Sequence, residues 1–287
     1  MNDEEPYVIR LEAREFARLA AFIQSSIGIK MPPHKLGLLE LRLGSRVRAL
    51  GLRSFEEYCE RVFDSCDAAC ELSELVDAVT TNKTDFFREP EHFGHLVSLA
   101  VPDLARRYPE LTQGGSLKVW SAGCSSGEEP YTIAMVLGEV AESHPGFDFG
   151  ITATDLSSAM LRAAALAVYP AGRVETVPRH YVSKYLMRSR DRDSRLVRVV
   201  PRLRAKLTLG RVNLMEQYPF ITPFDVIFCR NVLIYFERDV QIDILQRMAD
   251  SLVDGGYLFV GHSETLHGMD LPLEQMAPTV YRREARS

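Results

Sequence analysis

The chain has 287 residues, of which 46% are hydrophobic, 25% are charged and 9% are aromatic, and its formal net charge is −5. This composition is typical of a globular protein and excludes collagen-like, fibrous and intrinsically disordered chains. The acidic balance argues against a protein that coats nucleic acid. No apolar run approaches the ~18 residues of a membrane-spanning helix, so we expect neither nucleic-acid binding nor membrane insertion.

The cysteines argue against a metal centre. Their number, five, is odd, and the polar start of the chain lacks the features of a secretory signal, which together predict reduced thiols in a cytoplasmic protein. Cys59, Cys66 and Cys70 fall on one stripe of a helix, and no second pair follows at the spacing of a zinc site. His92 and His95 lack an accompanying carboxylate–histidine pattern and are interpreted as structural. We therefore predict no metal site.

The N-terminal part of the chain, residues 7–80, has the apolar spacing of helices. Ser54 with Glu57 three residues later predicts a capping box at the start of one helix. The other predicted helices cover residues 11–23, 34–50 and 68–79. This part is predicted to form a helical domain over residues 1–80, followed by a linker over residues 81–115.

From about residue 115 onward, short apolar runs alternate with helical segments, which is typical of an α/β domain with a parallel sheet and helices on both faces. A small antiparallel hairpin is predicted to interrupt this domain, 116–287, at residues 181–207. The predicted strands are 117–120, 149–154, 206–209, 224–229, 257–260 and 279–282, and the predicted helices are 131–140, 157–168 and 238–252.

Basic residues gather in two places in this acidic protein. Residues 28–53 carry six basic and one acidic residue, and residues 184–206 carry nine basic and two acidic residues. Lys35, Arg42 and Arg46 share one stripe of a predicted helix. This stripe could simply be a solvent-exposed helix face, but the presence of two basic clusters in an acidic protein favours docking surfaces for an acidic partner.

A ligand site is predicted where the first strand of the α/β domain ends. Gly123 and Gly127 allow a sharp turn there and a close approach of the backbone to a ligand. The loop is not G-x-G-x-x-G, and Glu128 and Glu129 open the next helix, so a pyrophosphate would be repelled. A cationic or zwitterionic ligand such as S-adenosylmethionine is favoured over NAD. Asp155, at the end of the next strand, is placed to accept hydrogen bonds from ribose hydroxyls.

Four segments together resemble the CheR family, the chemotaxis receptor methyltransferases. They are TTNKTDFFREPEHF (80–93), SAGCSSGEEPY (121–131), FDVIFCRNVLIYF (224–236) and GGYL with GHSE (255–264). The resemblance covers nearly the whole chain. It implies a Rossmann-like S-adenosylmethionine-dependent domain, an N-terminal all-helical docking domain and a small inserted antiparallel β-subdomain.

The resemblance also implies the reaction and the residues that carry it. Methyl groups pass from S-adenosylmethionine, leaving S-adenosylhomocysteine, to glutamates on the cytoplasmic helices of methyl-accepting chemoreceptors. Arg88 and Tyr235 would face the transfer site, and Lys35, Arg42 and Arg46 would dock the receptor. The linker would fold over the cofactor. The expected cofactor contacts are Asn82, Thr84, Arg88, Gly123, Glu129, Asp155, Asn213, Leu214, Arg230 and Asn231.

Two alternatives stay open at this point. One is a methyltransferase for another substrate, although residues 230–233 lack the prolines that follow the fourth strand in adenine N-methylating enzymes. The other is a cofactor-binding signalling adaptor without turnover. The polar turn at 188–195 lacks the glycine of those family members that bind a receptor tail by strand addition, so tail binding is not predicted.

Overall fold

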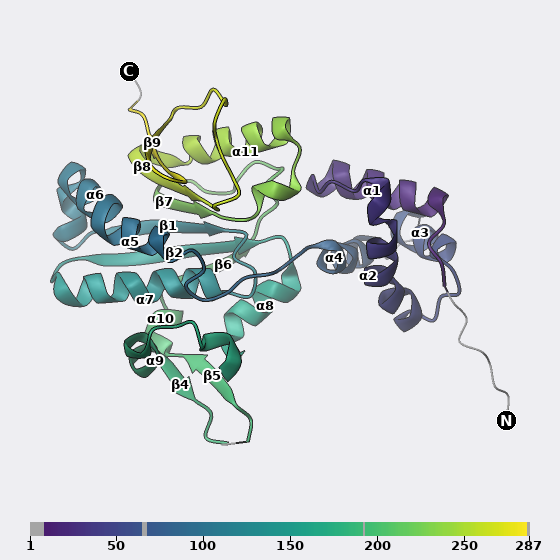
Figure 1. Ribbon diagram of the computed structural model, residues 1–287, viewed down its shortest axis with the longest axis horizontal. Coiled ribbons are helices and arrows are strands. Elements are labelled where there is room, and N and C mark those ends of the chain that lie inside the picture. The colour runs from purple at the N-terminus through teal and green to yellow at the C-terminus, as the bar shows by residue number, and fades with distance from the viewer. Residues whose placement is uncertain (1–8, 65–67, 192, 286–287) are drawn as a thin grey trace. The chain divides into compact units, whose positions relative to one another are not determined.

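The computed structural model describes residues 9–64, 68–191 and 193–285 (Figure 1). It divides into two compact units, one of Met1–Thr81 with Tyr235–Glu237 and one of Asn82–Ile234 with Arg238–Ser287. No helix in the described part of the chain has the length and apolarity that a bilayer crossing requires.

The first unit is helical and packs around a small apolar core. Leu19, Ile23, Leu43 and Tyr58 are fully buried in it because they recur on the inward faces of the helices. Gly28, with φ 73°, ends the first helix in the left-handed conformation. The elements are α1 (Ala13–Ile27), η1 (Pro33–Lys35), α2 (Leu36–Ala49), α3 (Phe55–Asp64) and α4 (Ala68–Val79).

The predicted cap of α3 is present in a shifted form. The Glu57 N–H donates to Ser54 Oγ at 3.2 Å, as a capping box requires, but the Glu57 carboxylate accepts from the Arg53 N–H at 2.7 Å, not from the Ser54 N–H. Cys59 is buried and unpaired in this helix. Cys66 lies outside the described residues, so the predicted stripe of thiols is seen only in part.

The second unit is built on a mixed seven-stranded sheet in the order β6-β2-β1-β7-β8-β10-β9. The pairs from β6 to β8 are parallel, whereas β10 is antiparallel to both β8 and β9. The expected parallel pairing is present among the central strands, and the edge of the sheet differs because β9 and β10 form a hairpin, whose strands are antiparallel. The strands are β1 (Ser116–Ala122), β2 (Asp148–Asp155), β6 (Leu207–Arg211), β7 (Phe224–Cys229), β8 (Leu252–Val260), β9 (Leu273–Ala277) and β10 (Val280–Arg283).

Helices cover both faces of this sheet, as predicted (Figure 1). One face presents Val119, Phe228 and Phe259 to the main hydrophobic cluster, which also contains side chains of α5, α6 and α7. The other face carries Trp120, which contacts Tyr218 with ring centroids 4.9 Å apart. The covering elements are α5 (Glu91–His95), η2 (Leu96–Ala100), α6 (Val101–Arg107), η3 (Pro109–Thr112), α7 (Glu128–Ser143), α8 (Ser158–Leu166) and α11 (Arg238–Asp250).

The predicted inserted β-subdomain is present as a three-stranded antiparallel sheet in the order β3-β5-β4. It begins earlier than the expected residue 181, because β3 pairs with one side of β5, whereas β4 pairs with the other side across the polar turn. Residue 192 of that turn lies outside the described residues. The elements are β3 (Val168–Pro170), η4 (Ala171–Val174), α9 (Arg179–Tyr185), β4 (Leu186–Arg188), β5 (Leu196–Val199) and α10 (Pro201–Arg204).

Candidate active site

The strand order reverses at β1, which has β2 on one side and β7 on the other. In open α/β sheets, ligands bind at such a switch point, outside the carboxyl ends of the strands. The loops after β1 and β7 touch there. A Cβ atom on Gly123 would lie 2.5 Å from Cγ2 of Val232, and Gly123 has φ +76°. Any other residue at this position would displace the Val232 side chain and would need a left-handed backbone conformation that favours glycine.

The loop after β1 is anchored to the end of β2. The backbone N–H groups of Gly123 and Cys124 donate to the Thr154 carbonyl at 2.8 and 2.9 Å. Asp155 is 8% exposed and accepts from the Ser125 N–H through Oδ2 and from the Ser157 N–H through Oδ1, each at 2.8 Å. The Asp155 carboxylate thus holds the loop in place, a role that the sequence did not reveal.

The segment after the helical unit lies against this loop. Ser125 Oγ donates to the Asn82 carbonyl at 3.0 Å. Arg173 donates to the Thr84 carbonyl at 2.7 Å and also pairs with the Glu128 carboxylate. Both Asn82 and Thr84 are therefore close to the glycine loop, as a segment that folds over a ligand there would be.

A single buried guanidinium joins three segments of the second unit. The Arg230 side chain is 1% exposed and donates to Glu129 Oε2 at 3.1 Å and to Glu89 Oε2 at 3.0 Å. It also donates to the Arg88 carbonyl. Ser121 Oγ donates to the other oxygen of Glu129 at 2.7 Å. Arg230 is thus surrounded by protein acceptors.

Burial and the positive charge of Arg230 have opposite effects on the pKa values of the carboxylates in this cluster. Burial raises the pKa of Glu129, and Arg230 counteracts that rise. Burial also disfavours ionised Glu89, but Arg230, together with hydrogen bonds from Arg230, Asn231 and the His262 N–H, lowers the pKa of Glu89 below its ordinary value. Burial, followed by the charge of Arg230, lowers the pKa of His92 to about 3, so its ring is neutral at physiological pH.

Sequence reasoning missed Glu264, which fixes the loop after β7. Its carboxylate accepts the backbone N–H groups of Asn231 at 2.8 Å, Leu233 at 2.7 Å and Ile234 at 3.4 Å, in addition to that of Gly261 at 2.6 Å. Asn231 has φ 59°, a left-handed conformation that a non-glycine residue adopts rarely. Glu264 belongs to the quoted GHSE segment, but nothing in that segment reveals which atoms its carboxylate contacts.

Two other expected site residues, Asn213 and Arg88, have local hydrogen-bond partners. Asn213 Oδ1 accepts from the Met215 N–H at 3.1 Å, and its amide donates to Glu216 Oε1 at 2.9 Å, the pattern of a turn former. Leu214 is 8% exposed beside it. Arg88 Nη1 donates to the Lys83 carbonyl at 3.0 Å.

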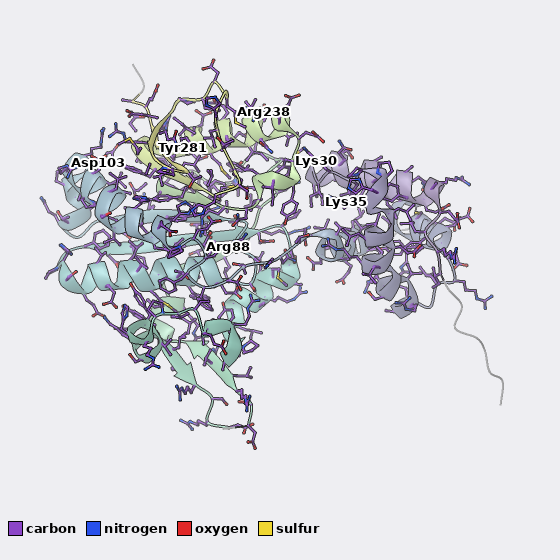
Figure 2. The ribbon with its side chains drawn as sticks, in the orientation of Figure 1. Lys30, Lys35, Arg88, Asp103, Arg238 and Tyr281 are labelled. Atoms are coloured by element: carbon purple, nitrogen blue, oxygen red, sulfur yellow. The ribbon has the colours of Figure 1, made fainter. Side chains whose placement is uncertain are left out.

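The remaining expected site residues belong to the helical unit. The Tyr235 carbonyl accepts from the Lys30 N–H at 3.0 Å, and Lys35 Nζ donates to the Lys30 carbonyl at 2.9 Å (Figure 2). Arg42 donates to Thr81 Oγ1 at 2.8 Å. Arg46 pairs through two nitrogens with Glu71, at 2.9 and 2.8 Å, and the Glu71 side chain is 3% exposed. The predicted basic stripe is thus partly engaged in stabilising its own domain.

Two family models divide the chain between them. Residues 14–80 match the CheR methyltransferase all-alpha domain, and residues 82–282 match the CheR methyltransferase SAM binding domain. The chain belongs to the CheR family. The predicted resemblance is confirmed, and so is the predicted fold class.

Characterised relatives of this CheR chain resemble it along most of its length. The chemotaxis protein methyltransferase of Borreliella burgdorferi is 35% identical over 96% of this chain and 96% of its own. The enzymes of the same name from Salmonella typhimurium and Escherichia coli are 36% and 35% identical, over 95% of this chain and 91% and 92% of their own. This CheR-family protein is an S-adenosylmethionine-dependent methyltransferase of chemotaxis.

The residues at the switch point of this CheR domain fit such a cofactor. The glycine loop brings backbone close to the carboxyl ends of β1 and β7. Glu129 and Glu89 place two carboxylates on one guanidinium, and Asp155 adds a third carboxylate at the end of β2. The charged groups named here therefore sum to a negative value, which suits a ligand with a sulfonium and an ammonium group.

Proposed function

We propose that this CheR-family protein transfers methyl groups to glutamate side chains on the cytoplasmic helices of chemoreceptors, forming methyl esters in the cytoplasm. The observation that carries the proposal is the match of both family domains across residues 14–80 and 82–282. The anionic carboxyl edge of the sheet supports the same assignment.

We assign cofactor binding to residues of the second unit. Asp155 lies at the carboxyl end of β2, where its carboxylate accepts the Ser125 and Ser157 N–H groups, and a carboxylate at the end of this strand is a suitable acceptor for ribose hydroxyls. Glu129 and the loop at Gly123 border the same edge of the sheet. When bound, S-adenosylmethionine supplies an electrophilic methyl group. The remaining residues of this assignment are Asn82, Thr84, Arg88, Asn213, Leu214, Arg230 and Asn231.

The acceptor chemistry needs no catalytic base. A glutamate carboxylate has a reference pKa of about 4.3 and is ionised at neutral pH, so it is already the nucleophile. Its weakness is the obstacle, and the protein must exclude water from it and align it for in-line displacement. We assign these tasks to Arg88, which can hold a carboxylate by directed guanidinium hydrogen bonds, and to Tyr235, which can donate its hydroxyl.

Receptor docking is assigned to the basic stripe formed by Lys35, at the end of η1, and by Arg42 and Arg46 of α2. An acidic helical bundle would be attracted and oriented by such a stripe. Lys35 and Arg42 are half-buried and donate to a carbonyl and a hydroxyl, so their positive charges are not neutralised by these contacts. Arg46 shares its charge with Glu71 and is expected to contribute less.

The decisive experiment uses S-adenosylmethionine labelled in its methyl group and a purified chemoreceptor cytoplasmic fragment. We expect label to enter the fragment and to be released as methanol in mild base, because methyl esters hydrolyse and N-methyl groups do not. Stable label would indicate a nitrogen acceptor, and absent label together with cofactor binding would indicate the adaptor. Either result would contradict the proposal.

A further inference from the structure

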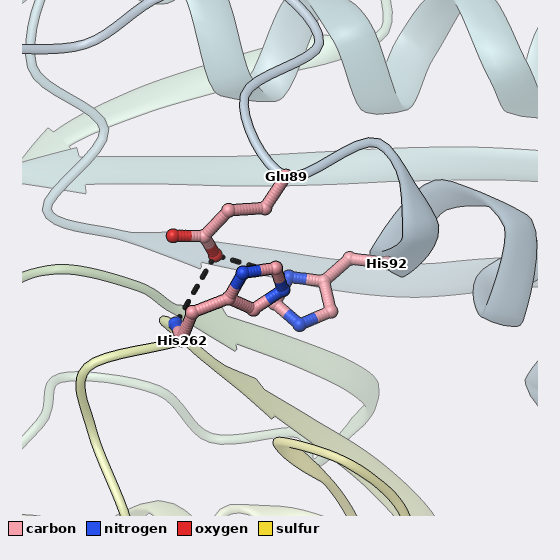
Figure 3. Close-up of side chains that lie close together, drawn as sticks. All are labelled: Glu89, His92 and His262. Carbon is pink, nitrogen blue, oxygen red and sulfur yellow. Dashed lines mark hydrogen bonds and ion pairs between the residues drawn. The ribbon is translucent and has the colours of Figure 1, made fainter.

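A carboxylate and two imidazoles from separate segments meet beside Arg230. Glu89 precedes α5, His92 lies within α5, and His262 follows β8 (Figure 3). One ligand atom from each of these side chains lies within 4.8 Å of the other two. Among residues 9–64, 68–191 and 193–285, no other group of three His, Cys, Asp or Glu side chains meets this distance.

His92 lies between Thr279 and Glu89. Its Nε2 is 2.7 Å from Thr279 Oγ1, and Thr279 Oγ1 is also 2.7 Å from the Pro278 carbonyl, to which it can donate its one proton. In the tautomer in which Nε2 donates to Thr279, the lone pair of the neutral ring lies on Nδ1, and this is the form that a metal ion would select. His92 is 1% exposed, Nδ1 has no hydrogen-bond partner, and it lies 3.5 Å from Glu89 Oε2. A buried ring nitrogen without a hydrogen-bond partner beside a carboxylate oxygen leaves room for a cation between them.

The spacing and the donors fit a tetrahedral metal ion. Zinc bonds of about 2.0–2.1 Å to nitrogen and oxygen place neighbouring ligand atoms ~3.4 Å apart, close to the observed 3.5 Å between His92 Nδ1 and Glu89 Oε2. Two imidazoles and one carboxylate also form a donor set that zinc sites use when a water occupies the fourth position. The exposed His262 ring, 5.1 Å from that of His92 between centroids, can rotate to complete it.

Each of the two inner ligands is supported by a further hydrogen bond. The non-coordinating nitrogen of His92 would donate to Thr279 Oγ1, 2.7 Å away, and Glu89 Oε1 accepts from Asn231 Nδ2 at 3.3 Å. Such second contacts orient ligands and make them better donors. We propose that Glu89, His92 and His262 bind a divalent transition-metal ion of the zinc type, and that this ion competes with Arg230 for Glu89.

Competition follows because one oxygen would serve both cations. Glu89 Oε2 accepts from Arg230 Nη2 at 3.0 Å, so a dication on the same oxygen is repelled by the guanidinium. The repulsion limits the affinity to a reversible range, and it weakens the contact that ties Arg230 to the segment before α5. Bound metal should therefore lower cofactor affinity, a consequence that rests on the proposed cofactor site.

Zinc titration against a chromophoric chelator tests the site directly. The background carries Cys66→Ser and Cys70→Ser, because a pair of cysteines four positions apart can bind added zinc. We expect micromolar binding that becomes about tenfold weaker or more in His262→Ala and Glu89→Gln. His267→Ala, an exposed histidine of the same C-terminal region, is the matched control and should bind as the background does. Equal zinc affinity in all these variants would overturn the proposal.

S-adenosylhomocysteine binding tests the coupling. Zinc at a concentration that fills the site in the His267→Ala control but not in His262→Ala should weaken this binding several-fold in the control and leave it nearly unchanged in His262→Ala. If zinc has the same effect on both variants, the competition with Arg230 is rejected. Because zinc titration requires no methyl acceptor, failure of receptor methylation would leave the metal site standing.

Discussion

The Glu129 carboxylate lies 3.1 Å from the guanidinium of Arg230, although the two residues are 101 positions apart in the chain. This contact joins the first turn of α7 to the loop after β7. Glu89 approaches the same guanidinium from the segment before α5, at 3.0 Å. Three segments that border the switch point of the sheet are therefore held by one side chain.

Replacement of Arg230 by Met should destabilise the second unit. The change leaves two largely buried carboxylates without their counter-charge, and breaking such a pair costs about 3–5 kcal/mol. Urea unfolding followed by circular dichroism measures the loss. Adding Glu89→Gln and Glu129→Gln to Arg230→Met should restore part of the stability. A loss under about 1 kcal/mol in Arg230→Met would show that the cluster contributes little.

Gly123→Ala should weaken S-adenosylhomocysteine binding for two separable reasons. The new methyl group meets Val232 at 2.5 Å, and φ +76° is unfavourable for alanine by about 1–2 kcal/mol. Calorimetry on Gly123→Ala and on Gly123→Ala/Val232→Ala separates the two. The double variant should bind more tightly than the single one, and identical affinities would argue against the steric contact.

Asp155→Ala should reduce S-adenosylhomocysteine affinity by about 1–3 kcal/mol, the cost of an unpaired buried polar group. The Ser125 and Ser157 N–H groups lose their acceptor in this variant. Asp155→Asn keeps one acceptor oxygen and should lie between Asp155→Ala and wild type. Unchanged affinity in both variants would exclude Asp155 from the site.

Acid should weaken the protein through Asp103 (Figure 2). Burial opposes its ionisation, but a hydrogen bond from Tyr257 and the guanidinium groups of Arg106 and Arg107 lower the pKa of Asp103 below 3.8. A carboxyl group whose pKa is lowered by folding stabilises the fold at pH values above its pKa in the unfolded chain, about 3.9. This stabilisation is lost as the pH falls through the pKa of the group in the folded protein. Asp103→Asn should therefore be less stable than wild type at pH 7 and should show a smaller decline between about pH 4 and pH 2. Parallel declines would contradict this origin.

The basic stripe should act on the receptor and not on the cofactor. Lys35→Gln/Arg42→Gln should slow receptor methylation several-fold at low salt, with little change in S-adenosylhomocysteine affinity, because charge steering is screened by salt. Arg106→Gln, an exposed arginine of the other unit, is the control. Arg46→Glu is unsuitable for this test, because it leaves the buried Glu71 beside a second acid and should destabilise the helical unit.

The central strands could be predicted because buried parallel strands are continuous apolar runs, and every residue of Phe224–Cys229 is buried. Strand β9, Leu273–Ala277, was not predicted, because it lies at the edge of the sheet and carries no fully buried residue. Strand β3 escaped because it has three residues and ends in a proline.

Site residues could be predicted only where their positions relative to the predicted strands indicate that they lie close together. Gly123 follows β1 and Asp155 is the last residue of β2, the neighbouring parallel strand, so it could be predicted that the two residues lie at the same edge of the sheet. Contacts between side chains that are far apart in the sequence produce no pattern that sequence analysis can detect. Glu89 and Arg230 are 141 positions apart, and the capping of the β7 loop by Glu264 spans up to 33.

Because Glu264 fixes the loop after β7, this loop can reach its final structure only after residue 264 has been synthesised. At ~5–20 residues per second, a ribosome makes residues 231–234 seconds before it makes Glu264. Until then, the amides of Asn231, Leu233 and Ile234 lack the carboxylate that they bind in the finished protein. A stalled or truncated translation product that ends before residue 264 should consequently be unable to consume methyl donor, however well its earlier strands have formed.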